Sequence, residues 1–342
     1  MTPQTNQNTT EKPQKNDDVA APGKSALDTF LEKILKIREY ASKLWSNLNN
    51  LEKSNIEAGI YHLRAGNYFD ASFRFRFATM LNKNNSVAWY LLGKSSFYAK
   101  KNAKAINALR NALKLNPNLD EAKFLINACG TRENLISIPR SFIIEKSDVM
   151  ATNYDQYLAQ IGGNISDTFS ELINGYYGDR IGINTLDLHC RGGELGTLVK
   201  NITNNMIGVE PSIKLAGMAR TRRDNNLLVF NYVQSKFPED YLKDTTDRFD
   251  LVICGLYFDN IGNLEPILSQ INKVLSPRGA LIFNSNKIAS PDFEFVRNSL
   301  IFGHSDVYMR KVLEKTGFKI ISTKEIKYAS NSTDIVYLVE KI

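Results

Sequence analysis

The chain has 342 residues, with 43% hydrophobic residues, 23% charged residues and a formal net charge of +7. These values are ordinary for a soluble globular protein, and the length allows two domains with separate cores. No apolar run reaches the ~18 residues that a membrane span needs, so we expect no membrane insertion. The basic residues are scattered rather than grouped in blocks, so binding of nucleic acid is not expected either.

The N-terminal residues 1–24 are rich in Gln, Asn, Thr, Lys and Pro and lack the apolar centre of a secretion signal. We therefore expect a disordered tail. The three cysteines, Cys129, Cys190 and Cys254, are odd in number and show no metal-ligand spacing. They indicate free thiols in a reducing compartment, so we predict a cytoplasmic location and no metal site.

Residues 25–50 predict a helix whose start Ser25 can cap. Apolar residues recur along it at three- and four-residue steps: Leu27, Phe30, Leu31, Ile34, Ile37, Ala41, Leu44, Trp45 and Leu48. Such a stripe either packs against a neighbouring helix or pairs two helices in a coiled coil. Because the stripe is wider than a strict two-in-seven seam, packing against a neighbour is favoured.

An internal repeat follows this helix. Three pairs of small residues stand 34 positions apart: Gly59 and Gly93, Ala71 and Ala105, Ala78 and Ala112. Small residues at this period let two antiparallel helices approach closely. The second copy also has Trp89, the expected core anchor, and Pro117, which ends its second helix. The first copy has Asn55 and Lys83 at those positions.

This pattern resembles the tetratricopeptide repeat. Residues 119–129 are expected to add a third first-helix that caps the stack, so residues 25–130 predict one all-α module. The resemblance implies a concave groove that binds a protein or peptide partner. Residues 131–148 contain Asn, Pro and charged residues and are predicted to be a linker.

From residue 149 to residue 342, strands and helices alternate. Seven apolar segments predict strands, namely residues 184–188, 206–210, 227–233, 250–254, 280–284, 319–326 and 334–339. Such alternation implies a mostly parallel sheet with helices on both faces. No helix separates the last two segments, so we expect them to form an antiparallel hairpin at one edge.

The first of these strands leads into a glycine-containing turn and a helix over residues 185–196, and the next strand ends in Glu210. This is the layout of a nucleotide-binding βαβ unit. Its glycines let the backbone approach the ligand, and its acidic residue binds the ribose hydroxyls. Gly193 and Glu210 match the layout, whereas His189 and Arg191 stand where glycines are expected.

The ordered motifs resemble a class I S-adenosylmethionine-dependent methyltransferase, which implies an α/β, Rossmann-like domain of seven strands. The whole chain looks like the bacterial group that joins tetratricopeptide repeats to such a domain. The likeness runs from about residue 55 to the C-terminus. It rests on residues 154–157, 186–196, 208–212, 249–252, 263–266, 303–308 and 317–318.

The resemblance implies S-adenosylmethionine as cofactor and a binding site formed by Asp187, Arg191, Gly193, Glu210 and Gln234. Glu210 is the expected ribose ligand, and Gln234 stands where an acidic residue usually receives the adenine amino group. Asp187 is expected to orient the cofactor or to serve the structure rather than to act as a base. Arg191 forms either a surface ion pair or a bond to the cofactor's carboxylate.

Three further residues leave alternatives open. His189 either packs under the edge of the sheet or points toward the methionine part of the cofactor. Leu256 stands where the related group tends to carry an acidic residue near the transferred methyl group. His304 is a candidate general base, although capping of the next helix by Ser305 explains its segment equally well.

Two functions fit these observations. Methyl transfer from a reactive sulfonium needs mainly alignment, so no catalytic triad is expected and no catalytic residue is assigned. The chain is thus predicted to be a methyltransferase for a substrate that the repeats recruit. Alternatively, it is an interaction protein whose methyltransferase fold is catalytically inert because His189 and Arg191 disturb the cofactor turn.

Overall fold

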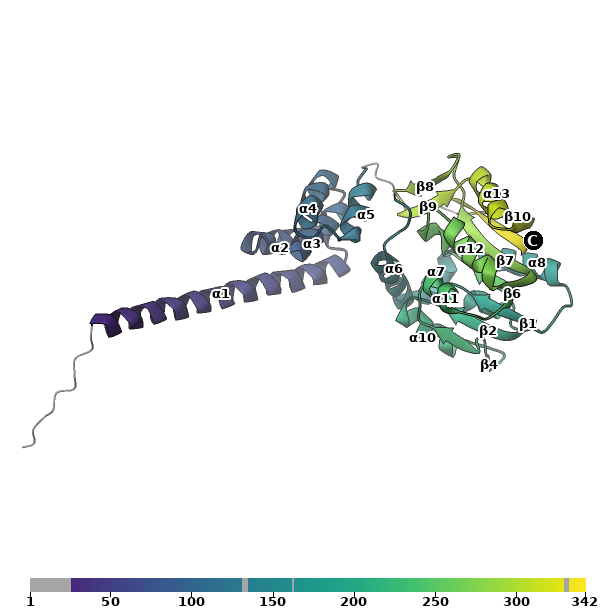
Figure 1. The fold of residues 1–342 in the computed structure, drawn as a ribbon, viewed down its shortest axis with the longest axis horizontal. Coiled ribbons are helices and arrows are strands. Elements are labelled where there is room, and N and C mark those ends of the chain that lie inside the picture. The colour runs from purple at the N-terminus through teal and green to yellow at the C-terminus, as the bar shows by residue number, and fades with distance from the viewer. Residues whose placement is uncertain (1–25, 131–134, 162, 329–331) are drawn as a thin grey trace, which may run out of the picture.

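The computed structural model describes residues 26–130, 135–161, 163–328 and 332–342 (Figure 1). The predicted tail, residues 1–24, and the capping Ser25 lie outside these ranges, as do residues 131–134 of the predicted linker. The N-terminal helices are α1 (Ala26–Arg64), α2 (Tyr68–Leu81), α3 (Ser86–Tyr98), α4 (Asn102–Leu115) and α5 (Asp120–Ala128).

The helices from the end of α1 to α5 pack as antiparallel neighbours and confirm the predicted repeat. A Cβ atom at Gly59 would lie 2.5 Å from the ring of Phe75, and one at Gly93 would lie 2.5 Å from Cγ of Leu109. The two glycines therefore allow equivalent helix pairs to touch. Phe75 and Leu109 anchor this core, because both are fully buried.

Trp89 is not the core anchor that the sequence predicts. Its side chain is only half-buried, and its Nε1 donates a hydrogen bond of 2.9 Å to the carbonyl of Lys83. The ring thus lies over the connection between α2 and α3 instead of between helices. The prediction was wrong because the repeat pattern places Trp89 on a helix face without stating how deeply that face is covered.

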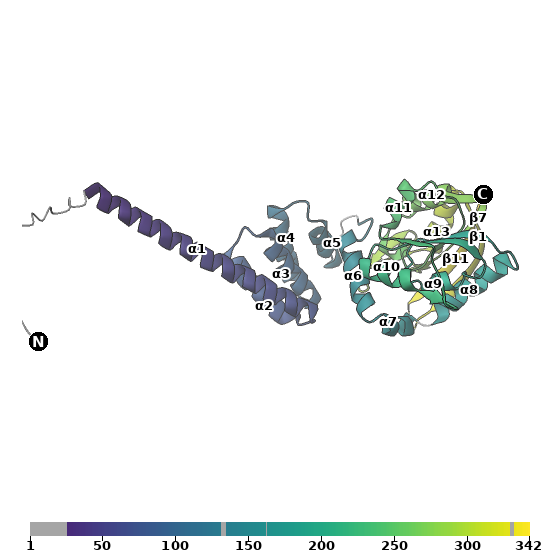
Figure 2. The same cartoon turned by 90° about the horizontal axis from the view of Figure 1, so that it is seen from below.

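The long helix α1 has two parts with different surroundings. Its C-terminal part packs against α2, whereas its N-terminal part extends away from the rest of the molecule (Figures 1 and 2). Ile37 and Trp45 in this extension are 69% and 68% exposed. The expected packing of the stripe against a neighbouring helix is therefore wrong for the residues of the extension that the structure describes.

Three helices lead from the repeats into the second domain: α6 (Arg140–Thr152), α7 (Tyr154–Ile161) and α8 (Gly163–Tyr177). Helix α6 begins inside the segment expected to be a linker and contacts the repeats. Nζ of Lys94 lies 2.5 Å from Oε2 of Glu145, and the rings of Phe124 and Phe142 are 4.9 Å apart. The chain thus places its own helix against the repeat module.

The second domain contains the predicted seven-stranded sheet, in the order β10-β11-β7-β6-β1-β2-β5. Its strands are β1 (Ile183–Asp187), β2 (Thr203–Val209), β5 (Tyr232–Gln234), β6 (Phe249–Cys254), β7 (Leu275–Asn286), β10 (Phe318–Lys327) and β11 (Thr333–Lys341). Strand β11 pairs antiparallel with both β7 and β10, while the other pairs are parallel. This confirms the parallel sheet and its C-terminal hairpin.

Two short antiparallel pairs lie outside this sheet: β3 (Arg223–Asp224) with β4 (Leu227–Leu228), and β8 (Phe293–Val296) with β9 (Ile301–His304). The strand predicted over residues 227–233 is therefore two strands, of which only β5 joins the sheet. The apolar run has no signal for the break, because Val229 and Phe230 between the strands are buried as well.

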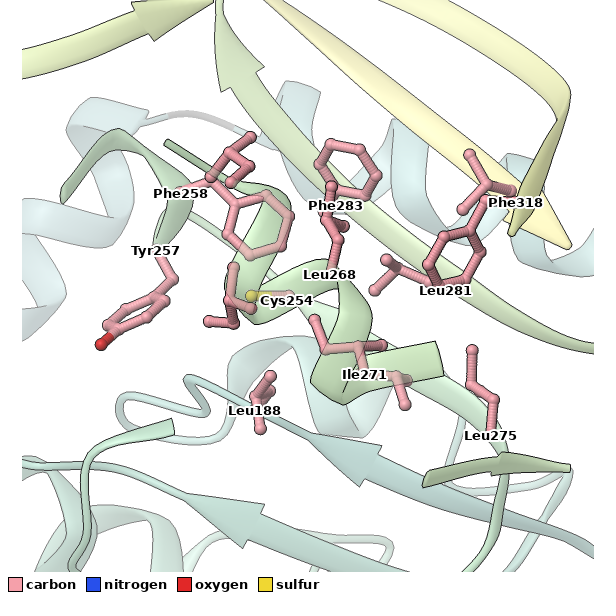
Figure 3. Packing of buried hydrophobic residues seen from close by; sticks show 14 of the residues in the cluster. Leu188, Cys254, Tyr257, Phe258, Leu268, Ile271, Leu275, Leu281, Phe283 and Phe318 are labelled. Atoms are coloured by element: carbon pink, nitrogen blue, oxygen red, sulfur yellow. The ribbon is translucent and has the colours of Figure 1, made fainter. Parts of the chain in front are cut away.

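Helices cover both faces of the sheet, as the alternation predicts. One face packs against α11 (Pro238–Asp244), α12 (Glu265–Val274) and α13 (Asp306–Lys315), and the other against α8, α9 (Glu194–Thr197) and α10 (Ile213–Thr221). Figure 3 shows the first of these cores, where the rings of Phe258 and Phe283 are 4.9 Å apart. Both cores hold the ends of the strands, and with them the turn after β1, in place.

Candidate functional site

The turn between β1 and α9 carries most of the predicted site. Its backbone is left-handed at Arg191, with φ of +47°, and at Gly193, with φ of +90°. Two features require glycine at position 193. Its backbone is left-handed, and a Cβ atom there would lie 2.8 Å from the ring of Phe230. In this structure Gly193 therefore shapes the turn through its backbone and its packing.

Arg191 lies inside the protein and not on its surface. Its side chain is 1% exposed, its Nη1 donates a 2.9 Å hydrogen bond to the hydroxyl of Tyr157, and its Nη2 forms an ion pair with Glu194. The surface ion pair considered from the sequence is thus wrong, because the turn folds the guanidinium inward under α7. The other predicted role of Arg191, a bond to the carboxylate of the cofactor, stays a prediction.

Tyr154, at the start of α7, closes the turn from outside. Its hydroxyl accepts a 2.8 Å hydrogen bond from the amide of Gly192 and donates one to Glu194. A Cβ atom at Gly192 would lie 2.5 Å from this ring. The amide that a nucleotide-binding turn would offer to a ligand is consequently held by the protein's own tyrosine.

Asp187 and Glu210 are fully buried carboxyl groups at the ends of β1 and β2. No hydrogen bond of good geometry reaches either oxygen of Asp187 among the described residues. Burial raises its pKa well above the ordinary value, although the backbone amide of His189 lies close enough to lower that pKa slightly. Glu210 accepts hydrogen bonds from the amides of Ser212, at 2.7 Å, and Arg191, at 3.2 Å. Burial still raises the pKa of Glu210 to about 8.

His189 packs in the same buried cluster. Its Nδ1 lies 3.1 Å from the carbonyl of Gly255, and its ring is 5.1 Å from that of Tyr257. Burial lowers the pKa of His189 to about 3, so the ring is neutral and its Nδ1–H donates to the carbonyl. The lone pair of Nε2 then faces Oε2 of Glu210 at 3.5 Å, which favours a protonated Glu210.

Gln234 and His304 lie at different parts of the domain. The carbonyl of Gln234 accepts a 3.0 Å hydrogen bond from the amide of Glu210, which brings the end of β5 to the end of β2. His304 is buried, with Nδ1 2.6 Å from the hydroxyl of Ser285 and Nε2 2.9 Å from the carbonyl of Ile261. Both nitrogens are thus engaged in holding loops, and a role as general base has no support.

A cavity of about 360 Å³ opens beside the turn. Its lining includes His189, Arg191 and Tyr157, and also Asp259 and Asp334, two acids that the sequence patterns do not single out. Asp259 had a signal in the sequence, since it follows by three positions Leu256, where related proteins tend to carry an acidic residue. Asp334 had none, because it belongs to the distant strand β11.

These two acids interact within a polar network. Oδ1 of Asp259 accepts a 3.2 Å hydrogen bond from the amide of Asn286, and Oδ2 of Asp334 accepts hydrogen bonds from Asn284, at 2.7 Å, and Tyr328, at 3.1 Å. Burial and the charge of Asp334 raise the pKa of Asp259 to about 7. A carboxyl group with such a pKa can exchange a proton near neutral pH.

Backbone strain marks the same cavity. Leu256 has φ of +55° and, like Arg191, lines the cavity with a left-handed backbone. Each such residue costs roughly 1–2 kcal/mol relative to an ordinary conformation. The amide of Leu256 donates a 2.7 Å hydrogen bond to Oδ1 of Asn284, which holds the strained loop. Strain of this kind tends to persist where it positions groups for binding or chemistry.

None of the helices in the described ranges is long and apolar enough to cross a membrane. A group of three or more His, Cys, Asp or Glu side chains that could hold a metal ion is also missing from the described part of the chain.

Two family models match the chain. The methyltransferase domain model matches residues 186–283, and the tetratricopeptide repeat model matches residues 86–119. The ubiquinone biosynthesis O-methyltransferase of Azorhizobium caulinodans is 25% identical over 104 residues, which are 30% of this chain and 40% of that protein. The alignment therefore spans less than half of this relative.

Two solved structures are also similar. The N-methyltransferase NodS from Bradyrhizobium japonicum, in complex with S-adenosyl-L-homocysteine, is 14% identical with a TM-score of 0.47, over 58% of this chain and 97% of NodS. Magnesium protoporphyrin IX methyltransferase from Synechocystis is 14% identical with a TM-score of 0.43, over 69% of this chain and 99% of that enzyme.

The strand order and the family matches agree with each other. The second domain has an α/β fold, and its residues 186–283 match the methyltransferase domain model. An all-α module that contains a tetratricopeptide repeat precedes this domain, as the sequence predicts.

Proposed function

We propose that the C-terminal domain binds S-adenosylmethionine and transfers its methyl group to an acceptor in the neighbouring cavity. The observation that carries this proposal is Asp187, a fully buried carboxyl group with no hydrogen bond of good geometry among the described residues and only the backbone amide of His189 nearby. A buried polar group without a partner is costly unless a ligand completes it. An ammonium group, such as that of the cofactor's methionine part, is the chemical complement of this carboxylate.

The other predicted residues take roles around this contact. Arg191 would bind the cofactor's carboxylate, Glu210 its ribose and Gln234 its adenine, while Gly193 maintains the turn. When bound, S-adenosylmethionine supplies an electrophilic methyl group on a positively charged sulfur. Burial raises the pKa values of Asp187 and Glu210, and a bound cation would lower them again because it favours the charged forms of these acids.

Binding at this turn requires a change in the protein. Tyr154 holds the amide of Gly192 at 2.8 Å, and Arg191 is tied to Glu194 and Tyr157. We infer that α7 moves away from the turn when the cofactor enters. Arg191 then exchanges its contacts with the protein for a contact with the ligand.

The methyl acceptor is proposed to bind in the cavity. Asp259 is placed to take a proton from an acceptor hydroxyl or amine, since its pKa is about 7. Asp334 keeps that pKa high, and the apolar side chains of Ile143 and Leu256 limit access of water. The repeats are proposed to recruit the substrate as a protein or peptide, on a surface that α6 leaves free.

A second function is favoured by the closed turn. If Tyr154 and the pair of Arg191 and Glu194 are permanent, the domain is a catalytically inert interaction module. In that state the buried groups stabilise the fold and exclude the cofactor. The two functions differ in a single measurable property, the affinity for S-adenosylmethionine.

Calorimetric titration with S-adenosylmethionine and S-adenosylhomocysteine tests the proposal. We expect the natural protein to bind both, Asp187→Asn to weaken binding by about 1–3 kcal/mol, and Tyr154→Phe to strengthen it because the Gly192 amide is released. Asp167→Asn, an exposed change on α8, is the matched control and should bind normally. Absence of binding in all four proteins would leave the inert module as the function.

A further inference from the structure

The exposed N-terminal part of α1 has an apolar face that the other described elements leave uncovered. Large apolar side chains along it are 38–72% exposed, namely Leu31, Ile34, Ile37, Tyr40, Leu44, Trp45, Leu48 and Leu51. In proteins, most of the stability of a helix comes from packing of its apolar face and little from the helix itself. The extension therefore needs an occupant.

A seven-residue repeat lies within this broad stripe. Leu27, Ile34, Ala41 and Leu48 are seven positions apart, and so are Phe30, Ile37, Leu44 and Leu51. Apolar residues at both positions over four consecutive heptads are the pattern of a coiled coil. The flanking residues Leu31, Tyr40 and Trp45 widen the stripe but do not interrupt the seam.

The seam is continuous with a face that is already covered. Two steps of four residues lead from Leu51 to Asn55 and Gly59, where α2 packs on α1. Asn55 is 8% exposed, and Glu52 at the boundary accepts hydrogen bonds from Asn82 and Asn85, which follow α2. Helix α2 therefore covers the face of α1 from residue 52 toward its C-terminal end. The same face N-terminal to residue 52 is open.

We propose that a second copy of this chain covers the open face, with the two α1 helices paired antiparallel in a homodimer. The charges of residues 26–51 nearly balance, with four basic residues and three acidic ones, whereas helices that lie on membranes are rich in Lys and Arg. A self-complementary seam repeats the same apolar residues on both partners, as a two-fold interface requires.

The position of α2 selects the antiparallel direction. A parallel partner helix would continue past residue 52 into the space that α2 occupies. An antiparallel partner helix would begin beside residue 52, where α2 ends, and would run along the same face toward residue 26. The two-fold axis that relates the two helices would then pass near residue 39. Burial of the eight exposed side chains on both helices removes on the order of 1,500 Å², close to a standard interface.

Light scattering on the full-length protein tests the dimer. We expect twice the monomer mass of 38.6 kDa. Ile37→Asp and Leu44→Asp should each raise the dissociation constant about 100-fold or more, because both copies of the charge enter an apolar seam. Ser46→Asp places the same charge on the outer, exposed face and should leave the dimer intact. A monomeric natural protein would overturn the proposal, as would dissociation by Ser46→Asp.

Two further measurements keep this test sharp. In a Trp45→Phe background, where the seam contributes little signal, the near-ultraviolet circular dichroism of each Asp variant should match that of the parent, which shows that the two folded modules persist. Spin labels at Lys53→Cys, in a Cys129→Ser background, should lie about 40 Å apart across an antiparallel pair, at 1.5 Å per residue. A distance below about 20 Å would indicate parallel helices and contradict the proposed arrangement.

Discussion

At the scale of single residues, the proposed chemistry depends on acids whose protons are held by burial. Asp187 and Glu210 lie under the turn, and Asp259 lies with Asp334 in the cavity. The raised pKa values of Asp187, Glu210 and Asp259 have a common cause, because water cannot solvate the charged forms and neighbouring carboxylates repel them. A positively charged ligand would therefore lower these pKa values and favour the charged forms of the acids.

The pKa of Asp259 predicts how stability changes with pH. The folded protein holds this proton up to about pH 7, whereas the unfolded chain releases it near pH 4. The folded state therefore binds more protons between these values, and Asp259 lowers stability as the pH rises from 4 to 7. Asp259→Asn removes this penalty and should raise the free energy of unfolding by about 1–3 kcal/mol at pH 8.

Urea unfolding at pH 5 and pH 8 measures this effect as a difference between the variant and the natural protein. The gain from Asp259→Asn should be clearly smaller at pH 5, where the natural side chain is already protonated in the folded state. Asp167→Asn, on an exposed surface, should show equal stability changes at both values. An identical gain at both pH values for Asp259→Asn would mean that this carboxyl titrates normally.

At the scale of elements, close contacts decide how the helices of the repeats pair. The glycine at position 93 has no room for a side chain, because Leu109 lies where its Cβ atom would be. Gly217 in α10 is also helical, yet no atom lies within 4 Å of the corresponding position. The same substitution should therefore have opposite signs at these two sites.

Gly93→Ala should destabilise the protein by roughly 1–3 kcal/mol, since overpacking moves α4 away from α3. Gly217→Ala should stabilise it by about 0.5–1 kcal/mol, because alanine is the better helix former. Thermal denaturation of the two variants beside the natural protein gives both signs in one experiment. Equal effects would show that the helix pair adapts freely and that the glycines of the repeat are not required by contact.

At the scale of the whole molecule, α6 joins the repeats to the methyltransferase domain. On one side Lys94 reaches Glu145 and lies 4.9 Å from the ring of Phe142. On the other side Arg140 donates two hydrogen bonds of 2.8 Å to Asp240. Helix α6 also lines the cavity through Ile143, so any shift of α6 with the repeats would change the wall of the cavity.

Lys94→Ala should loosen this connection. Nζ of Lys94 is largely buried, so its loss leaves Glu145 without its ion pair and exposes Phe142. We expect the repeats to unfold about 1–3 kcal/mol more easily than the methyltransferase domain, which splits one calorimetric transition into two. Lys123→Ala removes an exposed ion pair with Asp120 and should keep a single transition. One transition in both variants would argue against coupling through α6.

The sequence by itself determined most of the elements and their order. The 34-residue period predicted the helix pairs, and the alternation of strands with helices predicted the parallel sheet and its final hairpin, because these patterns are local. It also predicted that Asp187, Arg191, Gly193, Glu210 and Gln234 form one cofactor site. For the turn itself, the sequence showed only that His189 and Arg191 stand where glycines are expected.

Only the tertiary structure decided what surrounds each face and each charge. Periodicity identifies the apolar side of α1 but not its cover, so the exposed seam was read as a packed one. Arg191 became a buried partner of Glu194 because α7 folds over the turn. Asp259 and Asp334 meet in one cavity although 75 positions separate them, since β11 inserts between β7 and β10. Such contacts depend on how distant elements pack, and no local pattern contains them.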